Sequence, residues 1–155
     1  MTDLRQFGIH KGEGKYHEEI IYSLAFLYNI ISRNIEQYLR PFGLSLGKWN
    51  ILLVIQHQGG EKGMPQVEIS KHLIVTPSNM TKMIDKLEQE GLVARSSLDG
   101  DRRVNMIKVT QKGKTVIEAA WPGYEDRMKQ AVACLQEDRQ RRLAGLLTGW
   151  LAKVV

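Results

Sequence analysis

The sequence predicts a mainly α-helical fold with one small β-hairpin, and three observations support this fold class. Apolar residues recur at helical spacing in several long segments, whereas only two short segments have a β-like composition. A polar turn with the sequence Asp-Gly-Asp-Arg-Arg, residues 99–103, separates those two short segments. The chain has 155 residues, of which 43% are hydrophobic and 25% charged, so it is long enough to bury one good core.

The composition also limits the classes of function. The formal net charge of +5 and the isoelectric point near 9.4 give a mild bias toward polyanionic partners. Cys134 is the single cysteine, which excludes an internal disulfide and fits a reducing compartment. The first residues lack the pattern of a signal peptide, and no apolar run approaches the ~20 residues that cross a bilayer. We therefore expect a cytoplasmic protein without membrane contact.

The first long amphipathic helix is expected over residues 16–39. The fifteen residues before it mix glycines and charges without a period, which indicates a flexible or loosely packed arm. In the helix itself, apolar residues recur every three or four positions, at Ile20, Leu24, Leu27, Ile31, Ile35 and Tyr38. The sequence Pro-Phe-Gly at residues 41–43 ends this helix.

Two shorter helices follow. Ser45 is a good N-cap for a helix with the apolar residues Leu46, Trp49, Leu52, Leu53 and Ile55. The glycine-rich segment 59–63 is expected to be a loop. A short helix is then expected over residues 65–73.

A further helix is expected over residues 77–90, followed by the β-hairpin. Thr76 is a good N-cap, a proline occupies the first helical position, and Gly91 suits the C-terminal cap. The two strands are expected at residues 92–97 and 105–110, with the polar turn between them.

Two last helices are expected, at residues 112–134 and from residue 137 onward. Pro122 should kink the first of them, and Cys134 near its end is expected to be a buried structural thiol. Their apolar positions are Val116, Ile117, Ala120, Tyr124, Met128 and Leu135, then Leu143, Leu146, Leu147, Trp150, Leu151 and Val154. Pairing with a second copy would bury the wide stripes of the terminal helices, and the alternative is that these helices wrap the central core.

The helix at 77–90 has one apolar and one polar face. The apolar face carries Met80, Ile84 and Leu87, with Met83 at its edge, whereas Ser78, Lys82, Asp85 and Gln89 point the opposite way and Asn79 and Thr81 lie on the flanks. The first two turns present short polar side chains and one lysine, which suits close approach to base edges in the major groove of DNA. The later turns are acidic and should stay away from phosphate. An ordinary solvated helix face is the alternative interpretation.

The polar turn carries Arg102 and Arg103, which could enter a minor groove or contact phosphates. Asp101 could hold one of these arginines in place by a charge-assisted hydrogen bond. Four more cations surround this region, namely Arg95, Lys108, Lys112 and Lys114. A solvated hairpin tip is the alternative. Together, the helix and the hairpin predict a winged helix-turn-helix lobe at residues 41–111, between dimerisation helices at 1–40 and 112–155.

Three segments resemble the MarR (multiple antibiotic resistance regulator) family. These segments are Leu-Ser-Leu-Gly-Lys-Trp at 44–49, Leu-Glu-Gln-Glu-Gly-Leu-Val at 87–93, and the hairpin segment Asp-Arg-Arg-Val-Asn-Met-Ile-Lys-Val-Thr at 101–110. The last is similar to the family's Asp-x-Arg signature that ends in Leu-Thr, with Val109 in place of the usual leucine. The resemblance extends over nearly the whole chain and includes the order of the elements.

This resemblance implies a cytoplasmic homodimer that binds a pseudo-palindromic operator in double-stranded DNA. Members usually act as repressors and are often released by a small aromatic or anionic ligand. By the same resemblance Arg103 matches the minor-groove arginine and Asp101 its orienting partner. The residues that match the major-groove positions are Ser78, Asn79, Thr81 and Lys82.

Other functions find less support in the sequence. Tyr22, Phe26, Trp49 and Trp121 could line a ligand cleft between the helical region and the DNA-binding lobe, although a place in the core is the favoured interpretation for each. The four histidines show no paired spacing, so we expect neither a metal nor another cofactor. No nucleophile–base or carboxylate pair has a recognisable spacing, which argues against an enzyme. A winged-helix module that binds proteins rather than DNA remains an alternative.

Overall fold

The computed structural model describes residues 4–9, 14–73, 77–98 and 101–154, and for residues 77–78, 97–98 and 101–105 only the backbone is described. The elements, in chain order, are η1 (Leu4–Phe7), α1 (Tyr16–Leu39), η2 (Arg40–Phe42), α2 (Leu46–Val54), η3 (Ile55–Gly59), β1 (Met64–Pro65), α3 (Gln66–Lys71), α4 (Pro77–Gln89), β2 (Val93–Leu98), β3 (Asp101–Val109), α5 (Gln111–Val132) and α6 (Glu137–Val154). The predicted fold class, mainly α with a small β-wing, is confirmed.

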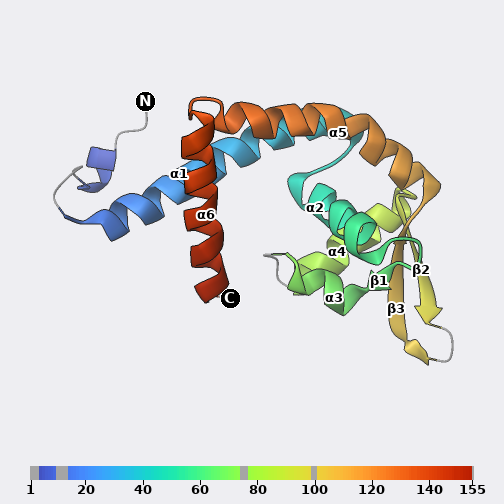
Figure 1. Cartoon of the computed structure of the whole chain (residues 1–155). Helices are drawn as coiled ribbons and strands as arrows, with labels where there is room; N and C mark the ends of the chain where they lie inside the picture. The colour runs from blue at the N-terminus through green and yellow to red at the C-terminus, as the bar shows by residue number, and fades with distance from the viewer. Residues whose placement is uncertain (1–3, 10–13, 74–76, 99–100, 155) are drawn as a thin grey trace.

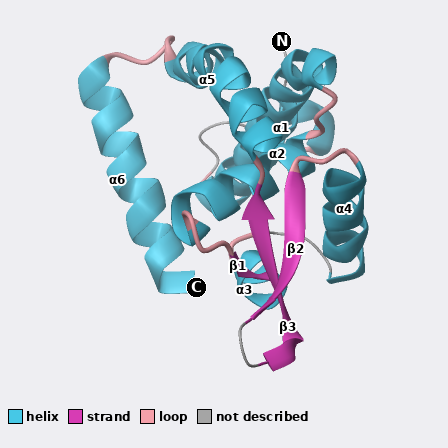
Figure 2. Ribbon diagram, turned by 90° about the vertical axis from the view of Figure 1, so that its right-hand side faces the viewer, coloured by secondary structure: helices cyan, strands magenta, loops and turns pink. Residues whose placement is uncertain are grey.

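The long helices α1 and α5 lie side by side above a lobe formed by α2, α3, α4 and the small sheet (Figure 1). In this lobe α4 lies beside the β2–β3 hairpin, and the hairpin projects beyond the helices (Figure 2). The helix α6 extends away from α5 along the outside of the molecule. None of the described helices is both long and apolar enough to cross a membrane.

The core lies where α2, α4 and the sheet meet the C-terminal end of α1 and the N-terminal half of α5. Its residues are fully or almost fully buried and include Ile35, Leu39, Trp49, Ile51, Leu52, Met80, Ile84, Leu87, Val93, Ile107, Ile117 and Ala120. The predicted apolar face of α4 is thus confirmed. Core residues come from all three of the segments expected at 1–40, 41–111 and 112–155, because α1 and α5 share the core of the lobe.

Local sequence signals explain how the elements of this lobe begin and end. The Ser45 hydroxyl accepts a hydrogen bond from the backbone N–H of Lys48 at 3.3 Å, which caps α2 as expected. Gly91 has a φ of +71°, and the backbone N–H groups of Gly91 and Leu92 bond to the carbonyls of Glu88 and Leu87. This pair of bonds is the Schellman arrangement, so Gly91 ends α4 as predicted. The predicted cap Thr76 lies outside the described residues.

The sheet has three antiparallel strands in the order β1-β3-β2, and the strand β1 was not predicted. Met64 pairs with Ile107 of β3, but a strand of two residues has no alternation that a sequence pattern could show. Gly63, just before β1, has a φ of +74°, and a Cβ atom there would lie 2.4 Å from the carbonyl oxygen of Ile107. Close pairing of β1 with β3 therefore requires glycine at this position.

The second hairpin strand begins earlier than the predicted residue 105. Asp101 already pairs with Leu98, with an irregularity in the register after Ser97. The backbones of Arg102 and Arg103 therefore belong to β3 rather than to the turn. The prediction failed because charged residues near a strand end resemble a turn in composition, whereas backbone pairing with β2 extends the strand through them.

The structure adds detail to the N-terminal arm and corrects the expectation for Cys134. The segment Leu4–Phe7 is a 3-10 helix in which no residue is buried. The ring of Phe7 stacks on Tyr22 of α1 with centroids 5.7 Å apart, and Ile9 is buried. Cys134 is exposed rather than buried, because it follows the end of α5, beyond the core. Pro122 lies inside α5, which changes direction along its length (Figure 1).

Candidate nucleic-acid interface

The first turns of α4 present polar side chains to solvent. Asn79, Thr81 and Lys82 are exposed, whereas Met80 between them is 1% exposed and packs in the core. The side chain of Ser78 lies outside the described atoms. The structure therefore places three of the four predicted base-contacting side chains on the outer face of one helix.

Gln66, in the first turn of α3, is a residue of this face that the sequence did not indicate. Its Nε2 donates a hydrogen bond to the Thr81 hydroxyl over 2.9 Å. The contact joins α3 to α4, the two helices of the helix-turn-helix unit. No local pattern could have shown a bond between residues that lie on different helices.

The hairpin lies next to α4, and the segment with Asp101, Arg102 and Arg103 is at its far end (Figure 2). The structure describes the backbone of these residues, but their side chains lie outside the described atoms. Helix and hairpin therefore form two neighbouring protrusions of one lobe.

Three of the four cations that the sequence places around the hairpin bond to other groups of the protein. Arg95 bonds to Asp85 and Glu88 of α4, and Lys112 donates to the carbonyl oxygen of Glu90 over 2.7 Å. Lys114 lies 3.2 Å from Glu61 and, by this hydrogen bond, lowers the pKa of that carboxyl group. The remaining one, Lys108, has an exposed side chain.

Burial by itself lowers the pKa of Arg95, but its hydrogen bonds with Asp85 and Glu88 outweigh that effect and hold the pKa above its ordinary value. The guanidinium group therefore stays charged, and its charge is balanced by two carboxylates of α4. Arg95 of the strand β2 thus partly neutralises the acidic C-terminal turns of α4.

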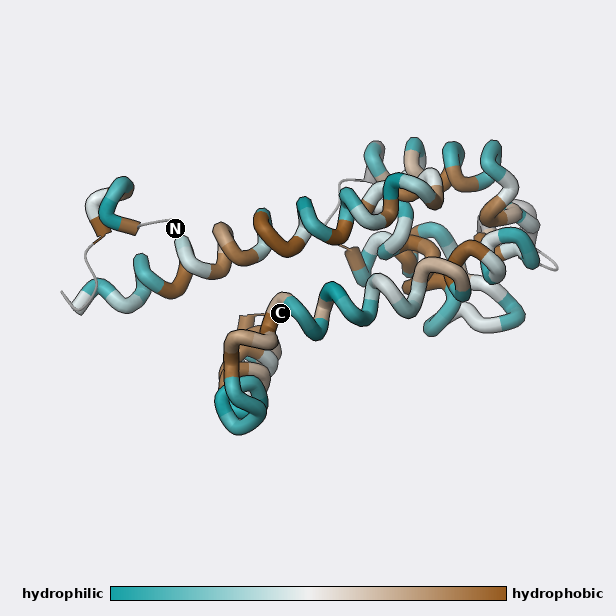
Figure 3. Tube along the Cα trace, turned by 90° about the horizontal axis from the view of Figure 1, so that it is seen from above, coloured by the Kyte–Doolittle hydropathy of each residue, from teal (hydrophilic) through white to brown (hydrophobic). Residues whose placement is uncertain are grey.

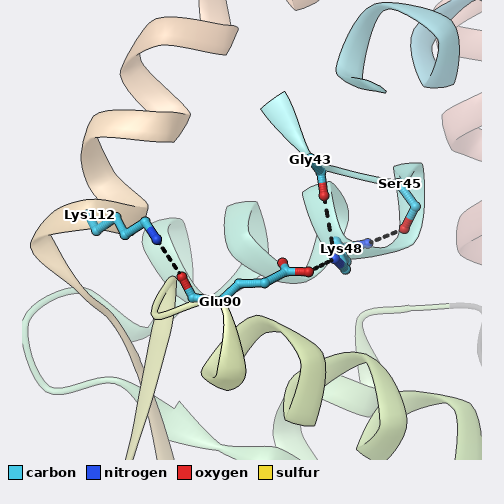
Figure 4. A network of polar contacts seen from close by, with 5 residues as sticks. All are labelled: Gly43, Ser45, Lys48, Glu90 and Lys112. Carbon is cyan, nitrogen blue, oxygen red and sulfur yellow. Dashed lines mark hydrogen bonds and ion pairs between the residues drawn. The ribbon is translucent and has the colours of Figure 1, made fainter. Parts of the chain in front are cut away.

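A second polar network joins the end of α4 to α2 and α5 (Figure 4). The Lys48 ammonium group donates to Glu90 Oε1 over 2.5 Å and contacts the Gly43 carbonyl oxygen at 3.4 Å. Lys112 bonds to the Glu90 backbone from the start of α5. The C-terminal end of α4 is therefore held from two sides, while its N-terminal turns face outward.

The four aromatic residues expected at a ligand cleft belong to two separate groups in the chain. Tyr22 and Phe26 both contact Phe7, whereas Trp49 and Trp121 lie 6.5 Å apart between ring centroids. The second group also includes Tyr124 and His57. Trp49 is completely buried, and its indole N–H has no hydrogen-bond partner among the described atoms. Among the described residues, no cluster of three or more His, Cys, Asp or Glu side chains could hold a metal ion.

Comparison with known proteins gives the same assignment for sequence and for fold. Residues 44–104 match the MarR family model. The transcriptional repressor IacR of Pseudomonas putida is 27% identical over 126 residues, which are 81% of this chain and 74% of IacR.

Solved structures share the fold. The MarR family regulator Sco3205 of Streptomyces coelicolor, solved in complex with DNA, has a TM-score of 0.76 and 20% identity, covering 86% of this chain and 84% of its own. CouR of Rhodococcus jostii RHA1, bound to p-coumaroyl-CoA, has a TM-score of 0.72 and 21% identity, covering 83% and 88% of the two chains. From these comparisons we conclude that residues 44–104 match the MarR family and that the chain has the winged-helix fold of solved MarR family regulators.

Proposed function

We propose that this protein is a sequence-specific repressor that acts in the cytoplasm as a homodimer on a pseudo-palindromic operator and leaves it when a small ligand binds. The observation that carries the DNA-binding part is the face of α4. Its N-terminal turns expose Asn79, Thr81 and Lys82, while Met80, Ile84 and Leu87 fix the opposite face in the core. In such a helix the N-terminal residues can reach base edges.

In this proposal the two protrusions of the lobe have different roles. Ser78, Asn79, Thr81 and Lys82 contact base edges in the major groove, where short polar groups can discriminate bases. Arg102 and Arg103 enter the adjacent minor groove or contact phosphates, with Asp101 orienting the arginine. The neighbouring positions of α4 and the hairpin support this division.

The homodimer is supported by large apolar side chains of α1 and α6 that one chain leaves exposed. Figure 3 shows hydrophobic positions along both helices. None of the described residues of α6 is buried, and the N-terminal half of α1 is similarly exposed. Large apolar side chains with more than a third of their surface exposed include Ile20, Ile21, Tyr22, Leu27, Tyr28 and Ile30 of α1, and Leu143, Leu146, Trp150, Leu151 and Val154 of α6. A symmetric pair of copies can cover both surfaces at once.

The salt dependence of DNA binding tests this function. If two helices and two hairpins engage one duplex, the log–log slope of affinity against salt should be about −5 to −10. Lys82→Ala should make the slope shallower by about 1 per protomer, because one cation that displaces counterions from the duplex is lost. Lys129→Ala, on α5 and paired with Glu125, is the matched control and should leave the slope unchanged. Binding that is absent or insensitive to salt would contradict the proposal and favour the protein-binding alternative.

Release by a small aromatic anion is the second part of the proposal. The group of Trp49, Trp121 and Tyr124 supports it, because it joins α2 of the DNA-binding lobe to α5 and contains an indole donor without a partner among the described atoms. A ligand that binds one arrangement of these helices better would shift the DNA-binding equilibrium.

Titration with benzoate and hydroxybenzoates should therefore change tryptophan fluorescence and release bound DNA. Trp121→Phe should weaken both effects, whereas Trp150→Phe on α6 should leave the release of DNA intact. Cyclohexanecarboxylate, which has the charge without the aromatic ring, is the ligand control. An unchanged DNA affinity with every aromatic anion would show that this ligand class is wrong.

A further inference from the structure

Arg95 of β2 makes an ionic contact with α4 that involves two carboxylates. One guanidinium nitrogen lies 2.5 Å from Asp85 Oδ1, and the other bonds to Glu88 Oε2. Asp85 and Glu88 are three positions apart on α4, so they are neighbours on the same side of the helix. Only 24% of the Arg95 side chain is exposed. Such partly desolvated, charge-assisted bonds have a more definite geometry than an exposed surface ion pair.

The position of Arg95 along β2 determines which part of the hairpin this contact holds. Val93, two residues earlier on the same face of the strand, is 2% exposed and packs in the core with α4. Ala94 and Ser96 are exposed on the other face. Beyond Arg95 the hairpin continues toward its far end, where Leu98 pairs with Asp101. Apolar packing therefore holds the base of the hairpin, and the ionic contact lies farther out along the strand.

The same contact also affects the net charge that α4 presents to a polyanion. Asp85 and Glu88 keep 45% and 38% of their side chains exposed, so without Arg95 two uncompensated carboxylates would lie on the DNA-binding helix. Since both guanidinium nitrogens already donate to carboxylates, Arg95 is not a free cation for phosphate.

We propose that Arg95 is a positioning residue for DNA binding, which holds the outer part of the hairpin at a fixed angle to α4. One duplex can then contact the polar side chains of α4 and the arginines at the end of the hairpin together. Because the hairpin is already held in place, binding costs less conformational entropy. This inference rests on the proposed function. It adds the residue that couples the two kinds of DNA contact.

The two carboxylates provide a test in which electrostatics and positioning predict opposite signs. Asp85→Asn and Glu88→Gln each remove a negative charge from the DNA-binding helix at constant side-chain size. Simple electrostatics therefore predicts tighter DNA binding. The loss of the Arg95 contact predicts weaker binding instead. Glu125→Gln, which removes a carboxylate from the Lys129 ion pair on α5, is the matched control and should leave affinity unchanged.

A double-mutant cycle between Arg95 and Arg103 tests the coupling itself. The probe is a duplex selected from a random pool by the wild-type protein, and affinities are measured at one salt concentration. Arg103→Ala should weaken binding in the wild-type background, but about tenfold less in the Arg95→Ala background, where the hairpin is no longer held in place. Arg95→Lys should rescue binding only in part, because an ammonium group does not reproduce the guanidinium fork.

Thermal unfolding of each variant measures its effect on stability. The double-mutant cycle identifies positioning, because a merely structural role of Arg95 would leave the effect of Arg103→Ala on DNA affinity unchanged. If Arg95→Ala does not fold, Asp85→Asn and Glu88→Gln still test the inference by the sign of their effect. Tighter binding by both of these variants, or an additive cycle, would overturn the role of Arg95. If the wild-type protein selects no duplex at all, the proposed function itself is wrong.

Discussion

Deletion of residues 137–155 is expected to convert the proposed homodimer into a monomer and to lower its affinity for DNA about a hundredfold or more. The physical reason is that α6 buries none of its described residues within its own chain, while its exposed apolar residues include Leu146 and Leu151. The core of the lobe contains no residue of α6, so the truncated chain should still fold. It would then bind one half-site through one helix and one hairpin.

Sedimentation and DNA titration of the truncated protein measure this effect. The log–log salt slope should fall to about half, since half of the phosphate contacts are lost. Leu146→Glu in the full chain should give the same result without a deletion, and Arg139→Glu, an exposed charged position on the same helix, is the control. A truncated protein that remains a dimer at micromolar concentration would show that α6 is not the dimerisation element.

Gly113→Ala is expected to cause a large loss of stability, about 3 kcal/mol. A Cβ atom at Gly113 would lie 2.2 Å from the carbonyl oxygen of Leu92 and 2.7 Å from Val109 Cγ1. The backbone cannot easily move away, because the N–H of Gly113 donates to the Thr110 hydroxyl over 3.0 Å. That hydroxyl in turn lies 2.7 Å from the Gly91 carbonyl oxygen. The substitution would therefore strain the junction between the hairpin and α5.

Denaturant unfolding checks this expectation. Glu118→Ala, on the exposed face of the same helix, is the matched control and should change the free energy of unfolding by less than about 0.5 kcal/mol. The Gly113→Ala protein should also bind DNA more weakly at temperatures where it is folded, since α5 connects the hairpin to the rest of the molecule. Equal unfolding midpoints for Gly113→Ala and the wild type would contradict this account of the junction.

The sequence alone determined most of the helical architecture, because helices are specified by interactions over three or four residues. The spacing of Met80, Ile84 and Leu87 defined the buried face of α4, and therefore also the polar face opposite to it. The caps at Ser45 and Gly91 were predictable for the same reason, since each depends on bonds to residues close by in the chain. The family signature of the hairpin was likewise visible in a single contiguous segment.

Only the tertiary structure decided how the charged and aromatic residues are paired. In the sequence Arg95 is one of several cations around the hairpin, and folding places it beside two carboxylates of α4, ten and seven positions away. Pairing with β3 created the strand β1 and extended β3 through the arginine segment, against the local composition. Tyr22 and Trp49 belong to different aromatic groups because they lie on different helices. Local periodicity shows which face of an element is buried, whereas the partner of a charge or a ring depends on which distant segments the core brings together.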